Sequence, residues 1–178
     1  MSCIVGIIEN EKVIIGGDSA GVRGLDIWVR KDPKVFKVGA FVIGGTTSFR
    51  MLQLIRFSFN PPEVPPGEDV FRYMCTGFVD ALRTCFKNGG FMTVSNSVES
   101  GGSFLVGYQN RLFSVESDFQ VTESVDGFEA IGCGESFALG ALCAMDTTTP
   151  ATYRVQKALE IAAYRSGGVR PPFIIEST

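Results

Sequence analysis

The N-terminal segment constrains the fold of this chain most strongly, because two apolar runs are separated there by a short polar turn. Residues 2–8 are mostly apolar and β-branched, residues 9–11 are polar, and residues 13–15 are apolar again. This pattern predicts a β-hairpin. Its apolar residues are nearly continuous rather than alternating, as expected for strands that are covered on both faces. We therefore expect the hairpin to lie in the interior of a layered structure.

Strands and pairs of helices alternate along the rest of the chain. Apolar residues at helical spacing predict helices, and we expect Thr46 or Thr47 to cap the first of them. Two polar, glycine-bearing segments, residues 19–32 and 87–102, are predicted to be loops. The predicted strands comprise residues 34–38, 40–43, 103–108, 111–115, 119–122, 128–131 and 173–175, and the predicted helices run through residues 51–55, 68–86, 135–142 and 149–165.

This order of elements predicts the fold class. Runs of strands that alternate with pairs of helices favour a layered α+β fold with helices on both outer faces. The chain has 178 residues, of which 45% are hydrophobic. A chain of this length is usually one domain with a substantial core. We therefore expect residues 1–178 to form a single domain.

The absence of histidine excludes several kinds of active site. A chain with 0 histidines cannot form a Ser-His-Asp or Cys-His triad, and it lacks the commonest metal ligand. If such a chain performs nucleophilic catalysis, its base must be a lysine, a carboxylate or the free α-amine. The α-amine is well suited to this role because its unperturbed pKa is about 7.7–8.0.

The cysteine content and the net charge describe the setting in which the protein works. The 5 cysteines show no C-x-x-C spacing, which disfavours a metal site and indicates reduced cysteines in a cytoplasmic protein. The net charge of −3 argues against nucleic acid or an anionic membrane as the main partner. No apolar run reaches the roughly 18 residues that a membrane span needs, and no signal peptide is recognisable.

Three residues near the N-terminus have a spacing that is typical of one enzyme family. Ser2 opens the first apolar run, Asp18 follows 16 residues later in a Gly-Asp pair, and Lys34 follows 32 residues after Ser2. In these features the chain resembles proteasome β-subunits and the bacterial protease subunit HslV, which are N-terminal-nucleophile (Ntn) hydrolases. The resemblance implies a four-layer αββα sandwich.

Later motifs extend the resemblance over nearly the whole chain, in the order of the family. Two positions depart from the family pattern. Ser2 replaces the usual threonine, and Ala163 lies where many proteasome subunits have an aspartate, three residues before a late serine. The matching motifs are a glycine pair after a strand, a G-S-G and a terminal S-G-G, represented here by Gly44-Gly45-Thr46, Gly132-Cys133-Gly134 and Ser166-Gly167-Gly168.

The resemblance implies a catalytic role for four of these residues. Removal of Met1 would give Ser2 a free α-amine, which would act as the base for the Ser2 hydroxyl. Lys34 would favour the alkoxide through its positive charge, and Asp18 would keep Lys34 charged and oriented. The backbone amide of Gly45 would stabilise the oxyanion.

Two supporting residues and one alternative nucleophile complete the predicted site. The resemblance places Cys133 and Ser166 near the nucleophile. Cys3 is the alternative nucleophile, and its use would require cleavage after Ser2. The chemistry that the resemblance implies needs no cofactor and no metal ion.

The resemblance implies a self-compartmentalising peptidase that hydrolyses amide bonds through an acyl-enzyme. Its expected partners are further copies of the chain in a ring or stacked rings, a peptide or unfolded protein as substrate, and, as an option, an ATP-dependent unfoldase. Two alternatives remain open. One is a catalytically silent structural ring component that retains Met1. The other is an Ntn amidohydrolase for a small amide, with a closed pocket and a lower oligomer.

Overall fold

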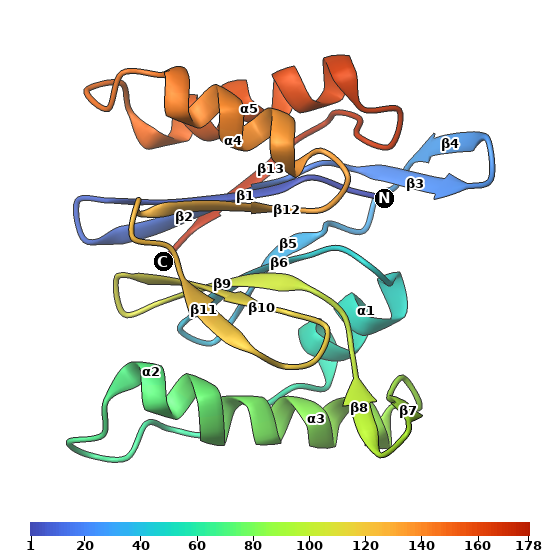
Figure 1. Ribbon diagram of the computed structural model, residues 1–178, viewed down its shortest axis with the longest axis vertical. Coiled ribbons are helices and arrows are strands. Elements are labelled where there is room, and N and C mark those ends of the chain that lie inside the picture. Colours follow the sequence, from blue (N-terminus) through green and yellow to red (C-terminus); the bar gives the residue numbers. More distant parts are fainter.

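The computed structural model describes residues 1–178, which form two main β-sheets, two small hairpins and flanking helices (Figure 1). The first sheet contains β1 (Ile4–Glu9), β2 (Lys12–Gly17), β12 (Phe128–Ile131) and β13 (Ile174–Ser177). The second sheet contains β5 (Val35–Val38), β6 (Phe41–Gly45), β9 (Phe104–Tyr108), β10 (Arg111–Val115) and β11 (Val121–Glu123). The hairpins are β3 (Ala20–Arg23) with β4 (Asp26–Val29), and β7 (Thr93–Ser95) with β8 (Val98–Ser100). The helices are α1 (Phe49–Phe57), α2 (Val70–Tyr73), the π-helical turn η1 (Met74–Phe78), α3 (Val79–Asn88), α4 (Glu135–Ala144) and α5 (Ala151–Arg165).

These elements form four layers. The two sheets, with strand orders β12-β1-β2-β13 and β11-β10-β9-β6-β5, lie face to face, and all their strand pairs are antiparallel. Helices α4 and α5 cover the outer face of the first sheet, and α1 with the α2–α3 segment covers that of the second (Figure 1). The predicted αββα sandwich of the α+β class is therefore confirmed.

The N-terminal hairpin lies inside this sandwich, as its apolar pattern predicts. Ile4 pairs with Gly17 at one end of the hairpin, and Glu9 pairs with Lys12 at the other. Ile4 belongs to the apolar cluster between the two sheets, whereas Val5 packs in the cluster beneath α4 and α5. Both faces of the strand are therefore buried, which explains why its apolar residues are nearly continuous.

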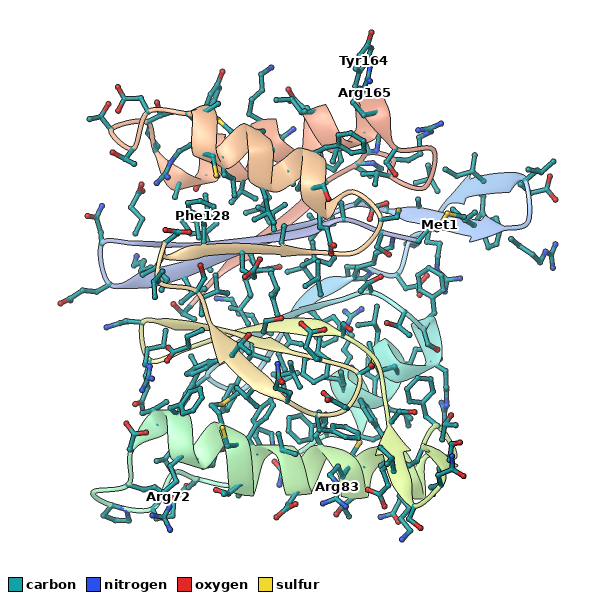
Figure 2. All side chains as sticks on the ribbon, in the orientation of Figure 1. Met1, Arg72, Arg83, Phe128, Tyr164 and Arg165 are labelled. Atoms are coloured by element: carbon teal, nitrogen blue, oxygen red, sulfur yellow. The ribbon has the colours of Figure 1, made fainter.

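Side chains fill the spaces between the layers and project into solvent from the outer helices (Figure 2). Arg72 and Arg83 point outward from the α2–α3 segment, and Tyr164 and Arg165 project from the end of α5. Met1 lies at the end of the sandwich from which the β3–β4 hairpin extends. No helix is both long enough and apolar enough to cross a membrane.

The structure differs from the sequence prediction in several local features. Residues 19–32 and 87–102 are not simple loops, because each contains a two-stranded hairpin. The residue that caps α1 is Ser48 rather than Thr46 or Thr47, since the Ser48 hydroxyl accepts a hydrogen bond from the Arg50 amide at 3.2 Å. The glycine pair that was expected to end a strand lies within β6.

Candidate functional site

The predicted site residues meet where β1 begins and β2 ends. Because Ile4 pairs with Gly17, the residue before Ile4 lies beside the residue after Gly17. The Cys3 amide donates to Asp18 Oδ1 at 3.0 Å, and the Asp18 amide donates to the Cys3 carbonyl at 3.3 Å. The register of the hairpin therefore places Cys3, the residue that follows Ser2, in contact with the Asp18 carboxylate.

Asp18 is the most heavily hydrogen-bonded group of the site. Its Oδ1 accepts from Lys34 Nζ at 2.8 Å as well as from the Cys3 amide. Its Oδ2 accepts from the amides of Ala20 at 2.8 Å and Arg170 at 3.2 Å. These four donors satisfy both oxygens of a carboxylate that is otherwise removed from water.

Lys34 is the buried cation that accompanies this carboxylate. The side chains of Lys34 and Asp18 are 1% and 0% exposed. Burial lowers the pKa of the Lys34 ammonium below its ordinary value, and the attraction of Asp18 acts in the opposite direction. The structure therefore brings Asp18 and Lys34 together, and Asp18 contacts Cys3, the residue that follows Ser2.

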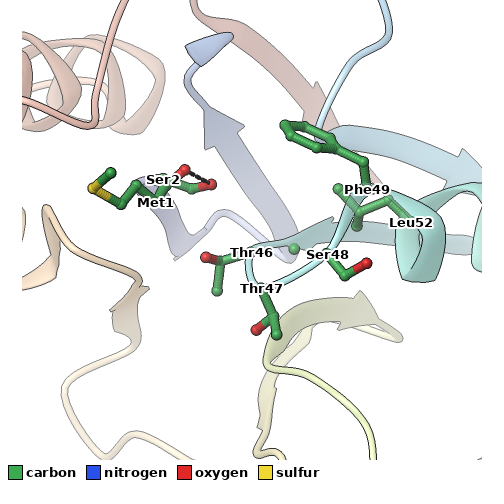
Figure 3. A pocket seen from close by; sticks show the side chains of 8 residues that line it. Met1, Ser2, Thr46, Thr47, Ser48, Phe49 and Leu52 are labelled. Carbon is green, nitrogen blue, oxygen red and sulfur yellow. Dashed lines mark hydrogen bonds between the residues drawn. The ribbon is translucent and has the colours of Figure 1, made fainter. Parts of the chain in front are cut away.

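Ser2 is held in place through its backbone. Its carbonyl oxygen accepts hydrogen bonds from the Gly134 amide at 3.3 Å and from Cys133 Sγ at 3.4 Å. Its hydroxyl donates to the Met1 carbonyl oxygen at 2.5 Å, the contact drawn as a dashed line in Figure 3. With Met1 attached, the nitrogen of Ser2 belongs to a peptide bond and is not basic. The hydroxyl acquires the predicted α-amine base only when Met1 is removed.

Of the two predicted supporting residues, Cys133 contacts Ser2 and Ser166 contacts Cys133. Cys133 Sγ is 3.4 Å from Ser166 Oγ, in addition to its contact with the Ser2 carbonyl. Gly132 has a positive φ of 99°, and a Cβ added there would lie 2.4 Å from the Ser2 carbonyl oxygen. The G-C-G motif is therefore a backbone support for residue 2, and only glycine fits its first position.

The Gly45 amide, to which the resemblance assigns the oxyanion, already has a backbone acceptor in this structure. This N–H donates to the Lys34 carbonyl at 3.0 Å within the pairing of β5 and β6, so it is not free to bind an oxyanion. The Thr46 amide is also engaged, with the Ser103 carbonyl at 3.1 Å. The next amide, that of Thr47, donates to no backbone acceptor, and Thr47 has a positive φ of 67°. The sequence gives no signal for this residue, because threonine rarely adopts such a φ.

The alternative nucleophile Cys3 has the wrong environment for that role. Its side chain is 0% exposed, and burial raises the pKa of its thiol to about 12. The thiolate is the reactive form of cysteine, and a thiol with this pKa is protonated near neutral pH. Cys3 packs instead in the apolar cluster beneath α4 and α5.

A small cavity adjoins Ser2 at the start of α1 (Figure 3). Its volume is about 20 Å³, taken as the space that the centre of a water molecule can reach. Lys34 lies close to one wall, since its Nζ is 5.9 Å from the centre of the Phe49 ring. No group of three or more Cys, Asp or Glu side chains is arranged to hold a metal ion. The cavity is lined by Met1, Ser2, Gly45, Thr46, Thr47, Ser48, Phe49 and Leu52.

Comparison with known proteins identifies the fold. No family model matches the sequence, and no curated protein matches it. Among solved structures, BPH of Thiobacillus denitrificans in complex with epoxomicin has a TM-score of 0.80 at 19% identity, over 99% of this chain and 97% of that one. HslV of Trypanosoma brucei has a TM-score of 0.70 at 18% identity, over 98% of both chains.

A third similar structure is a Gly-1 mutant of Anbu from a Hyphomicrobium strain. Its TM-score is 0.70 at 15% identity, over 98% of this chain and 80% of that one. All three proteins are proteasome-like Ntn hydrolases. The chain therefore has the proteasome/HslV fold of Ntn hydrolases, as the sequence resemblance implies.

Proposed function

We propose that the protein is a proteasome-like Ntn hydrolase that cleaves peptide bonds through an acyl-enzyme on Ser2. One observation carries this proposal: Asp18 Oδ1 binds both the buried Lys34 ammonium and the amide of Cys3, the residue next to Ser2. A buried lysine–carboxylate pair at the N-terminal residue of this fold has a clear chemical use. Such a pair would supply a fixed positive charge to favour the loss of a proton from a nearby serine hydroxyl.

The first step of the proposed mechanism creates the base. Removal of Met1 frees the α-amine of Ser2 and also removes the carbonyl to which the Ser2 hydroxyl donates. The amine, with a typical pKa of about 7.7–8.0, then accepts the hydroxyl proton as Oγ attacks the substrate carbonyl. The charge of Lys34 favours the developing alkoxide and lowers the proton affinity of the amine.

The remaining steps follow from the same groups. The tetrahedral intermediate carries a negative oxygen, and we assign its stabilisation to the amide of Thr47, a residue that lines the cavity and whose N–H lacks a backbone acceptor. The α-ammonium returns its proton to the leaving amine, and the acyl group remains on Ser2 Oγ. Water, deprotonated by the same amine, then attacks the ester; the acyl group leaves as a carboxylic acid, and the α-ammonium returns the proton to Ser2 Oγ.

Two rival functions share this fold and make different predictions. A structural ring component would retain Met1, and its Ser2 hydroxyl would stay bonded to the Met1 carbonyl. A small-molecule amidohydrolase would ignore peptides and form a lower oligomer. We propose the peptidase, assembled with copies of itself in a ring and working in the cytoplasm. The five free cysteines fit a reducing compartment. An unfoldase partner is an extension of this proposal.

The test compares peptide hydrolysis by the wild type, Ser2→Ala and Ser136→Ala. Alanine at position 2 is also small enough for methionine removal, so only the hydroxyl is lost. Ser136 is exposed on α4, and its substitution serves as the control. We expect Ser2→Ala to lose hydrolysis while native mass spectrometry shows the same oligomer. Turnover by Ser2→Ala at the wild-type rate would contradict the mechanism.

A further inference from the structure

We infer that Thr47 is a positioning residue whose side-chain oxygen, by binding the Ser103 amide, keeps the Thr47 N–H free for the oxyanion. This inference rests on the proposed function, which assigns the oxyanion to that N–H. It adds a role for the threonine side chain and for the residue that precedes β9. The contacts that carry it lie between the end of β6 and the start of α1, where Figure 3 labels Thr46, Thr47 and Ser48.

Thr47 is the central residue of a tight turn after β6. The Ser48 amide donates to the Thr46 carbonyl at 2.8 Å, a bond between residues two positions apart, and Thr47 has a φ of 67°. This is a γ-turn with a positive central φ, the rarer and more strained of the two γ-turn forms. Every other non-glycine residue with a positive φ is unbranched at Cβ. Strain of this kind persists only where surrounding contacts enforce it.

The pairing of β6 with β9 shows which contact the turn replaces. Thr46 lies opposite Ser103 where this pairing ends, and the Thr46 amide donates to the Ser103 carbonyl at 3.1 Å. In a regular antiparallel ladder the Ser103 amide would donate back to the Thr46 carbonyl. That carbonyl instead accepts from the Ser48 amide, and the Ser103 amide donates to Thr47 Oγ1 at 3.2 Å. The threonine hydroxyl therefore takes the place of a backbone carbonyl.

This exchange fixes the direction of the Thr47 N–H. The peptide between Thr46 and Thr47 is trans, so its C=O and N–H point in opposite directions. While the carbonyl is turned to Ser48, the Thr47 N–H faces away from the Ser48 amide and has no backbone acceptor. If the carbonyl turned back to the Ser103 amide, the N–H would turn with it. The Thr47 hydroxyl selects between these two orientations, because it supplies the alternative acceptor for Ser103.

Two further contacts hold the Ser103 amide against this turn. A Cβ added to Gly102 would lie 2.9 Å from Thr47 Cβ, so a side chain at position 102 would push Thr47 out of place. The Ser103 hydroxyl donates to Glu116 Oε2 at 3.4 Å. Ser103 is therefore bound through its carbonyl, its amide and its side chain, and Thr47 is clamped to a fixed segment.

A purely structural role for Thr47 is the rival interpretation. Thr47 lies two residues before α1, so its contacts could serve only to start that helix. The helix already has a cap, however, because the Ser48 hydroxyl accepts from the Arg50 amide. A structural role predicts that loss of the Thr47 hydroxyl lowers stability. A positioning role predicts a selective loss of kcat.

The experiment measures kcat and KM for peptide hydrolysis by Thr47→Val, Thr47→Ser and Thr47→Gly, each prepared without Met1. Valine has the shape of threonine but no acceptor. We expect kcat to fall about 100-fold, as for loss of one oxyanion donor, with KM unchanged. Serine retains the hydroxyl and should retain most of the wild-type kcat. Glycine adopts a positive φ without strain but lacks the clamp, and its kcat should lie between those of serine and valine.

A peptide aldehyde provides a second readout that a structural role would not change. Ser2 Oγ bonds to the aldehyde carbon, the hydroxyl proton passes to the α-amine, and the carbonyl oxygen becomes an oxyanion. The corresponding peptide alcohol forms no such adduct. In Thr47→Val we expect the affinity for the aldehyde to fall about as much as kcat does, while the affinity for the alcohol stays unchanged.

Thr84→Val is the matched control. Thr84 lies on α3 in the outer helical layer, and its hydroxyl donates to the Asp80 carbonyl at 2.8 Å. The same substitution therefore removes one hydroxyl hydrogen bond from a different layer, and we expect kcat and KM to stay at their wild-type values. If Thr47→Val does not fold, the comparison of serine with glycine decides, because only serine retains the acceptor.

A wild-type kcat in Thr47→Val would overturn the inference. So would equal losses of kcat in the serine and glycine variants, or equal losses of affinity for the aldehyde and the alcohol. These outcomes leave the proposed function intact, because the wild type still hydrolyses peptides. Failure of the wild type without Met1 to hydrolyse any peptide would overturn the proposed function, and the inference with it.

Discussion

Two carboxylates at opposite ends of the N-terminal hairpin bind similar groups but in different surroundings. Asp18 follows β2 at one end, and Glu9 closes β1 at the other. Each pairs with a cation, Asp18 with Lys34 at 2.8 Å and Glu9 with Arg154 at 3.0 Å. Each also accepts backbone N–H bonds from a segment more than a hundred residues away. Contacts alone therefore do not distinguish the two sites.

The difference lies in burial and in what each carboxylate holds. Glu9 is 27% exposed, and both of its oxygens accept from the Ala151 amide, at 2.9 and 3.1 Å. It thus caps α5, whose N-cap residue Pro150 has no side-chain cap. Asp18 is 0% exposed and holds a buried ammonium beside the N-terminal residue. On this difference we base the proposal that the buried pair serves chemistry and that the partly exposed pair stabilises a helix end.

The largest effect is expected for Asp18→Asn. The substitution leaves the Lys34 ammonium buried without its counter-charge, and breaking a buried pair in this way typically costs about 3–5 kcal/mol. We expect a stability loss of that size by urea denaturation, together with loss of peptide hydrolysis. A variant as stable as the wild type would show that the pair does not hold this end of the hairpin.

Lys34→Met should lower stability less than Asp18→Asn does, but it should abolish peptide hydrolysis equally. After this change Asp18 still accepts bonds from the amides of Cys3, Ala20 and Arg170, so its charge remains compensated. We expect a smaller fall in the free energy of unfolding than for Asp18→Asn, with hydrolysis abolished. Measuring both quantities on each variant separates packing from chemistry. Retention of hydrolysis by Lys34→Met would remove the lysine from the mechanism.

Glu9→Gln should lower the free energy of unfolding by about 1 kcal/mol at neutral pH, the typical value of a helix cap, and should leave peptide hydrolysis unchanged. Bonds from the Ala151 amide and Arg154 hold the pKa of Glu9 below its ordinary value of 4.5. The charged Glu9 side chain therefore contributes its full stabilisation above its ordinary pKa of 4.5. This stabilisation is lost as the pH falls through the lower pKa that Glu9 has in the folded protein. Thermal melts across this range should show a weaker acid sensitivity in Glu9→Gln. Equal pH dependence of the two proteins would contradict this role.

The smallest effect is expected for Lys157→Ala on the exposed face of α5. Lys157 pairs with Glu160 at 2.9 Å, but the two side chains are 47% and 44% exposed. Solvent screens such a pair, so we expect no resolvable change in melting temperature or hydrolysis. A clear loss of stability would mean that exposed pairs matter in this protein, and it would weaken the contrast drawn between buried and exposed sites.

The family resemblance implies the pairing of Asp18 and Lys34, which lie 16 positions apart and flank strands of different sheets. It does not predict the Arg170 amide as a further donor, since that contact joins residues 152 positions apart. It does not predict that the Gly45 amide donates to the Lys34 carbonyl, because that bond follows from the register of β5 and β6. The sequence does not single out Thr47, because nothing about a threonine indicates that its φ will be positive.

The hairpin within residues 19–32 was missed for a different reason. Strands are recognised by alternation of buried apolar and exposed polar residues. All four residues of β4 are exposed, among them the apolar residues Ile27, Trp28 and Val29. No buried face produces an alternating pattern there, so backbone pairing alone defines the strand.

The mass of the N-terminal peptide in a hydrolysing preparation tests the central claim most directly. Digestion after Lys12 should release a peptide that begins at Ser2, because only a free α-amine at Ser2 can act as the base. The account predicts that peptide hydrolysis increases with the fraction of chains that begin at Ser2. Full hydrolysis by chains that all begin at Met1 would contradict it.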